Sequence, residues 1–416
     1  MTFVIDTDET FIAELQVIET KAVLVNETDT HYVILNCDQS LYYSDESSVC
    51  GRINALVLKE DTREILAIGP TKPYAMETFQ KMYGGKTTIE VTEMIEGLFF
   101  QLFWDDRIRK WEIGTHNGIF GNYSFYRMPH IKATTYRSMI CQAMGNIEDL
   151  NDWKGLEYMD KKMCFHFVLQ HPENHLVFKI EKPAIYLIGA FEMHVNQVKN
   201  QIRYVPSEEY EKIFPSDLVL LPNVLDHDHD DAYADTDTDT DTENNEAKYQ
   251  DIIEKYVSIQ EPNTRMGIVI KQKTTGDSFI VINPAYEELQ KIRGAHPNIL
   301  YHYLCMRRMK KTDEFLHWFP QYQEFFAQFD DLYGSLVTKL HQSYLDHFVL
   351  KKKVAIHKKY FYHIQQLHRT VFVPSLREGE TKVIVKKNVV KKYVEGLEPG
   401  HILHILQYEL YLMEEK

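Results

Sequence analysis

The chain has 416 residues, of which 44% are hydrophobic and 12% aromatic, and it carries a formal net charge of −15. This length predicts two or three domains with enough apolar material for a buried core. No apolar run approaches the roughly 18 residues that cross a bilayer, and the acidic start "MTFVIDTDETFIAEL" lacks the pattern of a signal peptide. These features argue against a membrane protein and against a secreted one.

The cysteines indicate the redox environment. Cys37, Cys50, Cys141, Cys164 and Cys305 are far apart, and no two of them form a CxxC pair. This spacing argues against both a zinc site and a disulfide framework. We therefore expect an intracellular, reduced protein.

The charge is unevenly distributed along the chain. Residues 226–246, "DHDHDDAYADTDTDTDTENNE", hold ten acids and no Lys or Arg, and the rest of the chain has a net charge near −5. Residues 351–393 hold twelve Lys or Arg against two acids. A low-complexity acidic run without apolar anchors predicts a disordered loop over 226–247. The basic stretch predicts a polarised surface.

In chain order, the first elements are predicted to be hairpins. Alternating apolar residues around polar turns predict them at "KAVLVNETDTHYVILNC" (21–37), "NALVLKEDTREILAIGP" (54–70) and "GLFFQLFWDDRIRKWEIGT" (97–115). Residues 129–150 have helical spacing. "CFHFVLQHPENHLVF" (164–178) predicts a strand, a turn and a second strand, and "RMGIVIKQKTTGDSFIVIN" (265–283) predicts another hairpin.

From residue 284 onward the pattern changes to helices. "AYEELQKIRG" and residues 313–353 show apolar and aromatic residues at helical spacing. The aromatic stripe of residues 315–348 is interpreted as helix core rather than as a surface for base stacking. "TKVIVKKNVVKKYV" (381–394) has a strand-like pattern. Together these elements predict an α+β chain, with antiparallel hairpins first and helices later.

The order of these hairpins resembles the nucleotidyltransferase domain of ATP-dependent RNA ligases of the T4 type, over about residues 50–350. "CGRINALVLKEDTREILAIGPTKP" resembles their lead-in hairpin, and "MIEGLFFQLFWDDRIRKWEIGTH" is similar to their nucleophile motif, K-x-D/E-G, with the strand pair behind it. "FVLQHPENHLV", "RMGIVI" and "DSFIVINPAYEELQKIRGAHP" resemble the third, fourth and fifth motifs. The phrasing also resembles proteins of large nucleocytoplasmic DNA viruses, which implies the host cytoplasm or a viral factory as the location.

The resemblance implies a domain plan. It places a β-rich lead-in at 1–90, the first part of a ligase-like, antiparallel-sheet core at 91–225, and the acidic loop at 226–247. The second part of the core follows at 248–295, a helical module at 296–350, and a basic C-terminal segment at 351–416.

The chemistry of such ligases needs charged residues that this sequence lacks. A lysine amine attacks the α-phosphate of ATP, and further lysines and a carboxylate-bound metal stabilise the transferring phosphate. The resemblance places Met94 at the nucleophile, Val168 and Met266 at the glutamates of the third and fourth motifs, and Ile280 at or near the lysine of the fifth. A thioether cannot form a phosphoramidate. A pocket lined by these four residues has no means to neutralise a triphosphate or to hold magnesium.

The loss is coordinated. Buried charges without partners are costly, so losing the whole network together leaves a self-consistent apolar core. We therefore expect no catalytic residue, no metal site and no cofactor. One alternative is that the chain never had a ligase fold and that these four are ordinary strand residues. Another is an active ligase, using ATP and Mg²⁺, whose nucleophile is displaced to Lys81, Lys86 or Lys110.

The preferred hypothesis is a catalytically degenerate RNA-ligase-like protein that binds RNA, an RNA end or an mRNA cap. Phosphates would contact basic side chains, and bases would stack on Tyr360, Phe361 and Tyr362. The candidate ligand-binding residues are Glu96, His116, Arg265, Lys271, Lys273, Lys358, Lys359 and Tyr360. The remaining hypothesis is a scaffold or protein-interaction subunit whose partners are other viral or host proteins. No membrane partner is expected.

Overall fold

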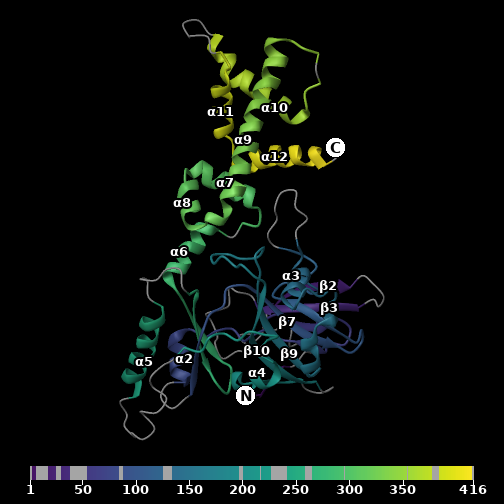
Figure 1. Cartoon of the computed structure of the whole chain (residues 1–416), viewed down its shortest axis with the longest axis vertical. Helices are drawn as coiled ribbons and strands as arrows, with labels where there is room; N and C mark the ends of the chain where they lie inside the picture. The colour runs from purple at the N-terminus through teal and green to yellow at the C-terminus, as the bar shows by residue number, and fades with distance from the viewer. Residues whose placement is uncertain are drawn as a thin grey trace. The chain divides into compact units, whose positions relative to one another are not determined.

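The computed structural model describes residues 2–5, 17–24, 30–37, 54–83, 88–124, 134–195, 200–215, 217–225, 241–257, 265–294, 296–353, 355–376 and 384–414. The chain divides into two compact units (Figure 1). The first comprises Met1–Ser124 with Thr134–Gln290, and the second comprises Phe125–Ala133 with Lys291–Lys416. Antiparallel sheets dominate the first unit and helices the second, so the chain is α+β, as the sequence predicts.

A six-stranded antiparallel sheet is the main element of the first unit. Its strand order is β1 (Thr2–Ile5), β11 (Asn200–Tyr204), β10 (Ala184–Val195), β9 (Met163–Gln170), β7 (Leu98–Asp105) and β8 (Lys110–Thr115). Successive side chains of a strand point to opposite faces. On β9, Phe165 and Phe167 therefore enter one core, and Cys164 enters the other. The predicted hairpin at 97–115 is confirmed by the antiparallel pairing of β7 with β8.

Short helices cover one face of this sheet. They are α3 (Tyr136–Ala143), the 3-10 helices η3 (Leu150–Asp152), η4 (Lys154–Tyr158) and η5 (Ser207–Glu209), and α4 (Tyr210–Ile213). The helix predicted over 129–150 is shorter than expected. Its end at Ala143 is followed by Gly145 and Asn146, whose φ angles of 106° and 58° are left-handed and end a helix. Residues 129–133 lie outside the described residues.

A four-stranded sheet packs on the opposite face. It comprises β2 (Val17–Leu24), β3 (Thr30–Cys37), β4 (Leu56–Lys59) and β5 (Ile65–Ala67), and its strands pair in the order of the sequence. The predicted hairpins at 21–37 and 54–70 are confirmed. Aromatic rings fill the space between the two sheets, and the Tyr32 ring contacts those of Phe103 and Phe120 edge to face.

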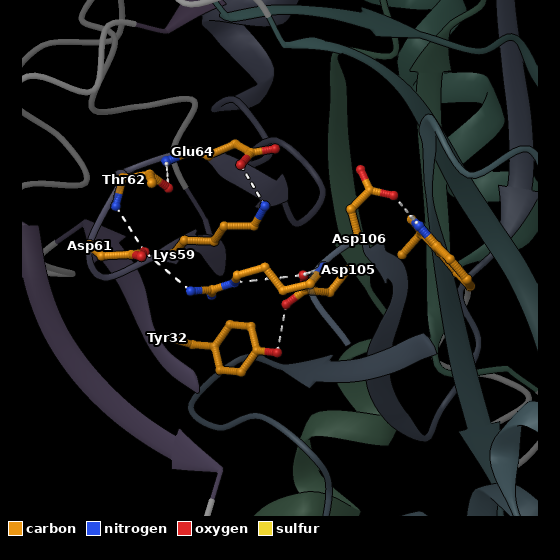
Figure 2. A network of polar contacts seen from close by, with 9 residues as sticks. Tyr32, Lys59, Asp61, Thr62, Glu64, Asp105 and Asp106 are labelled. Atoms are coloured by element: carbon orange, nitrogen blue, oxygen red, sulfur yellow. Dashed lines mark hydrogen bonds and ion pairs between the residues drawn. The ribbon is translucent and has the colours of Figure 1, made fainter. Parts of the chain in front are cut away.

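A polar network joins the four-stranded sheet to the end of β7 (Figure 2). The Tyr32 hydroxyl donates to the fully buried Asp105 carboxylate at 2.7 Å, and the Arg107 backbone N–H donates to the same carboxylate at 2.8 Å. The Arg107 guanidinium donates to Asp61, in the β4–β5 turn, at 3.2 Å. Burial, reinforced by Asp105, raises the pKa of Tyr32 far above its ordinary value, so its hydroxyl remains a donor.

A three-stranded sheet completes the first unit. Its order is β13 (Ser278–Ile282), β12 (Gly267–Gln272) and β6 (Ile89–Glu93), and the predicted hairpin at 265–283 is confirmed by the pairing of β12 with β13. Helices α2 (Met76–Tyr83) and α5 (Asp241–Tyr256) pack on one face of it through Phe79, Tyr249 and Phe279.

The second unit consists of helices. They are α7 (Ile299–Met309), α8 (Thr312–Trp318), η6 (Pro320–Tyr322), α9 (Gln323–Tyr344), α10 (Lys358–Leu367), η9 (Pro374–Leu376), α11 (Lys387–Glu395) and α12 (Pro399–Glu414), with π-helical turns η7 (Leu345–Val349) and η8 (His368–Phe372). Helix α6 (Pro284–Arg293) contains the boundary between the units. The aromatic stripe is helix core, as predicted, because Phe315, Phe326, Phe329 and Tyr333 are buried.

Three local predictions differ from the structure. Residues 175–178 are not a strand, because their backbone groups serve a side chain described below. Residues 387–394 are helical rather than strand-like, since Val390 and Val394 recur at the helical spacing and are both buried. Of the acidic loop predicted at 226–247, residues 241–247 belong to α5, and residues 226–240 lie outside the described residues.

The segments predicted at 296–350 and 351–416 belong to one compact unit. Helices α10 and α11 both pack against α9, and α12 packs against α7. In the part of the chain that the structure describes, no helix is both long and apolar enough to cross a membrane.

Candidate functional site

The link between β6 and β7 holds the residues of the predicted nucleophile motif. Met94 is partly buried, and its backbone N–H donates to the Gly267 carbonyl at 2.9 Å, which places it beside the start of β12. Gly97 is needed for a close approach of two chain segments. A Cβ at that position would lie 2.3 Å from the Leu169 carbonyl oxygen and 2.6 Å from a methyl group of Val168. The link therefore passes directly over β9.

The four positions of the lost network belong to two sheets. Met266 directly precedes β12, and its carbonyl accepts a hydrogen bond from the Asn283 N–H, so it lies at the same end of the sheet as Met94. Ile280 lies in β13 opposite Val269. Val168 lies in β9 and is 7% exposed. The structure therefore brings Met94 and Met266 together at one end of the three-stranded sheet. Val168 lies close to the β6–β7 link, at Gly97.

Lys271, a predicted ligand candidate, places a cation near the four apolar positions. It alternates with Ile268 and Ile270, which enter the core under α2 and α5, so it lies on the opposite face of β12. Its ammonium donates to the Ile188 carbonyl of β10 at 3.2 Å. Lys271, one of the predicted ligand candidates, therefore extends from the three-stranded sheet to the six-stranded one. We call this meeting of Lys271 with β9 and β10 the inter-sheet junction.

A buried histidine lies at the same junction. His166 of β9 is 1% exposed, and burial lowers its pKa to about 4, with a further lowering by the charge of Lys271. Its Nε2 lies 2.5 Å from the Ile68 carbonyl, which can only accept, so Nε2 carries the hydrogen and Nδ1 is left as an acceptor. No described residue donates to Nδ1.

The sequence offered one signal for His166 that was missed. A histidine in the middle of the apolar strand "CFHFVLQ" is unusual, and it pairs with Gly189 of β10. A Cβ at Gly189 would lie only 2.9 Å from Nδ1 of His166, so glycine leaves the space that the imidazole occupies. The pairing of His166 with Gly189 could not be found without the strand register.

Glu96, the acid retained from the nucleophile motif, is buried and surrounded by hydrogen-bond donors of the protein itself. It is 5% exposed, and its oxygens accept hydrogen bonds from the backbone N–H groups of Leu176, Val177 and Phe178 at 2.7 to 3.2 Å. The Tyr286 hydroxyl donates to the same carboxylate at 2.9 Å. These donors explain why residues 175–178 leave the sheet pattern, because their N–H groups point to one carboxylate.

The other ligand candidates of the first unit are dispersed. His116 is partly buried, and burial and then the charge of Lys72 lower its pKa. The Arg265 guanidinium lies over the Tyr256 ring and donates to its carbonyl at 3.4 Å. Lys273 forms an ion pair with an exposed Glu208 at 3.5 Å. Unlike Lys271, none of these three makes a contact with β9 or β10 that the described residues record.

Two of the three proposed replacement nucleophiles are described by the structure, and they lie at exposed positions in different elements. Lys81 lies in the last turn of α2 and Lys110 at the start of β8, and both are exposed. Lys86 lies outside the described residues. Lysine reactivity requires a lowered pKa, which burial or neighbouring cations provide and exposure does not.

In the second unit, the ligand candidates divide between structural and exposed positions. The Lys359 ammonium donates to the carbonyls of His404 and Ile405 in α12, at 3.3 and 2.6 Å, so it holds two helices together. Tyr360 is partly buried, and Lys358 is exposed. The neighbouring Phe361 and Tyr362 are 43% and 61% exposed. The side chains most open to a ligand are therefore Lys358, Phe361 and Tyr362, while the Lys359 ammonium is engaged by α12.

Metal ligands do not cluster in the described ranges, where no group of three or more His, Cys, Asp or Glu side chains is arranged to hold an ion. Cys141, Cys164 and Cys305 are free thiols. A carboxylate-bound magnesium ion would need oxygen ligands at 2.0–2.1 Å in octahedral geometry. At the positions where the resemblance requires two glutamates, the side chains of Val168 and Met266 offer no oxygen.

Comparison with known proteins gave no match to a protein-family model and none to a curated protein. Among solved structures, the chain is similar to Naegleria gruberi RNA ligase with ATP and Mn, at 14% identity over 70% of this chain and 84% of that one, with a TM-score of 0.36. It is also similar to an archaeal ATP-dependent RNA ligase, at 10% identity over 95% of this chain and 86% of that one, with a TM-score of 0.40. Both are RNA ligases, the family that the sequence motifs resemble. A likeness at these TM-scores is too slight to carry an inference about activity, ligand or partner.

Proposed function

We propose that this chain is a catalytically degenerate protein of the RNA-ligase type, which binds RNA, at an end or a cap, without adenylation chemistry. The observation that carries the proposal is the position of Met94. It occupies the β6–β7 link beside Met266, where the motif requires a lysine amine and a glutamate. A thioether has no proton to lose and cannot form a stable bond to phosphorus in place of a phosphoramidate.

The retained acid supports this proposal. In an active site, Glu96 would need free oxygen atoms for a ligand or a metal. Here three backbone N–H groups and the Tyr286 hydroxyl occupy the carboxylate. The residue has the contacts of a structural group, which is what remains when a catalytic network is lost but its scaffold is kept.

The cations support RNA as the ligand. Lys351, Lys353, Lys358, Arg369, Lys386, Lys387 and Lys392 are exposed, and none forms an ion pair with a described residue. Unpaired surface cations bind phosphates and release the counterions around them, so the affinity falls steeply with salt. At the inter-sheet junction, Lys271 offers one further cation to a phosphate.

The test has two measurements on the full chain. Incubation with α-labelled ATP or GTP and Mg²⁺ or Mn²⁺, followed by a denaturing gel, should give no labelled band beside an active ligase control. Titration of a labelled RNA at several salt concentrations should show that the logarithm of the association constant falls linearly with the logarithm of the salt concentration. A labelled band would overturn the proposal that the chain is catalytically degenerate. An absence of RNA binding at low salt would overturn the proposal that RNA is its ligand.

An active nucleotidyltransferase is the second candidate, and Lys271 is the observation that favours it. It is the lysine that the structure places at the inter-sheet junction, next to a neutral histidine. The same gel decides the matter with two variants. A band that is lost in Lys271→Met and kept in Lys110→Met, an exposed lysine of β8, would establish Lys271 as the nucleophile. A scaffold without nucleic-acid ligand predicts neither a band nor RNA binding.

A further inference from the structure

Helix α10 presents a row of exposed side chains opposite its buried face. His363, Ile364 and Leu367 pack inward. The outward row consists of Lys358, Phe361 and Tyr362, which are exposed, the partly buried Gln365, and the exposed Arg369 of the π-helical turn η8 that continues α10, and we call it the α10 stripe. These residues lie three, four, seven and eleven positions after the first, which places them on one side of a helix. At 1.5 Å per residue the row is about 16 Å long.

The α10 stripe has cations at its ends and aromatics between them. Lys358 and Arg369 are exposed and form no ion pair with any described residue. Phe361 and Tyr362 are among the exposed large hydrophobic residues of the chain, at 43% and 61%. The sequence from residue 347 to 376 contains no Asp or Glu, so no acid of this segment neutralises the row.

A basic turn lies beside the aromatic part of the stripe. The Phe361 ring contacts the His347 ring of η7 edge to face, with their centroids 5.5 Å apart. Directly after η7, Lys351 adopts a left-handed φ of 49°, and the Lys352 N–H donates to the Asp346 carbonyl at 2.8 Å. This bond fixes the turn that carries residues 351–353, three consecutive lysines. The arrangement gives an aromatic surface bordered by cations on more than one side.

From this arrangement we infer that the α10 stripe is a track for single-stranded RNA. Lys358 and Arg369 would hold phosphates, and Phe361 and Tyr362 would stack on bases. Aromatic side chains stack on every base, so the track would recognise the strand without reading its sequence. In a duplex the base faces are already stacked on each other, so the track would discriminate against double-stranded RNA. This inference rests on the proposed RNA binding and specifies its substrate class.

A protein partner would mainly use the aliphatic residues of this region rather than the cations of the stripe. Val349, Leu350, Val373 and Leu376 are exposed aliphatic side chains near the two π-helical turns, and an apolar partner would bury them together with Phe361. The unpaired cations at the two ends of the stripe, the aromatics between them and the lack of Asp or Glu from residue 347 to 376 favour a polyanion with flat groups. An experiment that changes only the aromatics and the cations can therefore distinguish an RNA ligand from a protein partner.

The experiment compares a fluorescent single-stranded uridine oligonucleotide with an RNA hairpin duplex carrying the same number of phosphates. Binding to the full chain is measured by anisotropy over a range of salt. The variants are Phe361→Ala, Tyr362→Ala and their combination, and the matched control is Trp318→Ala, which removes an aromatic of the same unit that is 38% exposed. Circular dichroism checks that each variant keeps its helices.

The expected result is tighter binding of the single strand than of the duplex. Each aromatic-to-alanine change should weaken single-strand binding about tenfold, since stacking contributes about 1–3 kcal/mol per base, while Trp318→Ala leaves it unchanged. Lys358→Gln and Arg369→Gln should each lower the salt slope by about 0.7. A 2-aminopurine base in the oligonucleotide should lose fluorescence on binding the wild-type chain and keep more of it in the double variant.

The opposing results are distinct. If the wild-type chain binds RNA but the aromatic variants bind it equally well, or the duplex binds as tightly as the single strand, the track is wrong while RNA binding stands. If the wild-type chain binds neither RNA at low salt, the proposed function fails and the track fails with it.

Discussion

The Tyr286 hydroxyl donates a hydrogen bond of 2.9 Å to the Glu96 carboxylate, although the two residues are 190 positions apart in the chain. Glu96 lies in the β6–β7 link and Tyr286 in α6, so this bond connects the link between two sheets to the helix that follows β13. The same carboxylate holds residues 176–178 through their backbone N–H groups. One buried acid thus fixes three distant segments of the first unit.

We predict that Glu96→Ala lowers the free energy of unfolding by about 3–5 kcal/mol, because it leaves buried N–H donors without an acceptor. Tyr286→Phe should cost about 1–2 kcal/mol, and the double variant should cost less than the sum of the two. Urea denaturation gives these values, with Glu148→Ala, an exposed acid, as the control. Additive costs would show that Glu96 and Tyr286 are not coupled.

The degenerate site should not be restored by one substitution. In Met94→Lys the amine would lie beside Met266 and near Val168, which provide no oxygen ligand for a metal and no partner for the new charge. We expect Met94→Lys to form no labelled adduct with ATP and Mg²⁺, because stabilisation of the transferring phosphate requires the other charged groups. A band from this single variant would show that only the nucleophile had been lost.

The hairpins could be predicted because their signals are local. Alternating apolar residues around a polar turn specify a pairing within about twenty residues, as for β7 with β8, and no distant contact is needed. Glu96 illustrates the limit of such signals. Its partners are three backbone N–H groups and a tyrosine, and backbone groups carry no residue-type signature. The strand-like expectation for 381–394 failed because alternating Val and Lys also fits a helix, and burial of Val390 and Val394 against neighbouring helices decides between them.

Lys271 shows a second limit. The sequence marked it as a phosphate ligand because it is basic and close to a motif, and it marked Lys273 for the same reason. The two are only two positions apart, and Lys273 directly follows the end of β12, yet Lys271 reaches the Ile188 carbonyl of β10 while Lys273 pairs with Glu208. Their destinations depend on how the sheets meet, which the order of hairpins in the sequence does not determine.

The buried histidine of the inter-sheet junction should make the first unit sensitive to acid. Burial lowers the pKa of His166 to about 4, below the ordinary value of 6.5 expected in the unfolded chain. Between these values the unfolded chain binds more protons, so stability is present above pH 6.5 and is lost as the pH falls towards 4. The loss is on the order of 3 kcal/mol. His166→Gln, which keeps a donor for the Ile68 carbonyl, should flatten this part of the curve.

The second unit contains a histidine of the same kind. Burial lowers the pKa of His302 to about 4, and the charge of Arg293 lowers it further. The pH dependence of stability measured on the whole chain will therefore include contributions from both histidines. His302→Gln is the variant to compare with His166→Gln. Unfolding followed by hydrogen exchange can assign each loss to its unit. An unchanged pH dependence in His166→Gln would contradict the burial of a neutral imidazole at the junction.

The Tyr32–Asp105 bond provides a last prediction, at the contact between the four-stranded sheet and β7. Asp105 is fully buried, and its carboxylate accepts from the Tyr32 hydroxyl, whose pKa is raised first by burial and then by Asp105. Tyr32→Phe keeps the ring contacts with Phe103 and Phe120 but removes this donor, so it should lower the free energy of unfolding by about 2 kcal/mol. In a chain that already carries Asp105→Asn, Tyr32→Phe should cost much less than in the wild-type chain. A neutral amide loses less stabilisation than a buried carboxylate does when the hydroxyl is removed. Urea denaturation measures all three, and Tyr158→Phe, at an exposed position, serves as the control. A cost for Tyr32→Phe no larger than that of Tyr158→Phe would show that the hydroxyl does not stabilise the buried carboxylate, and that the contact between the two sheets depends on their other interactions.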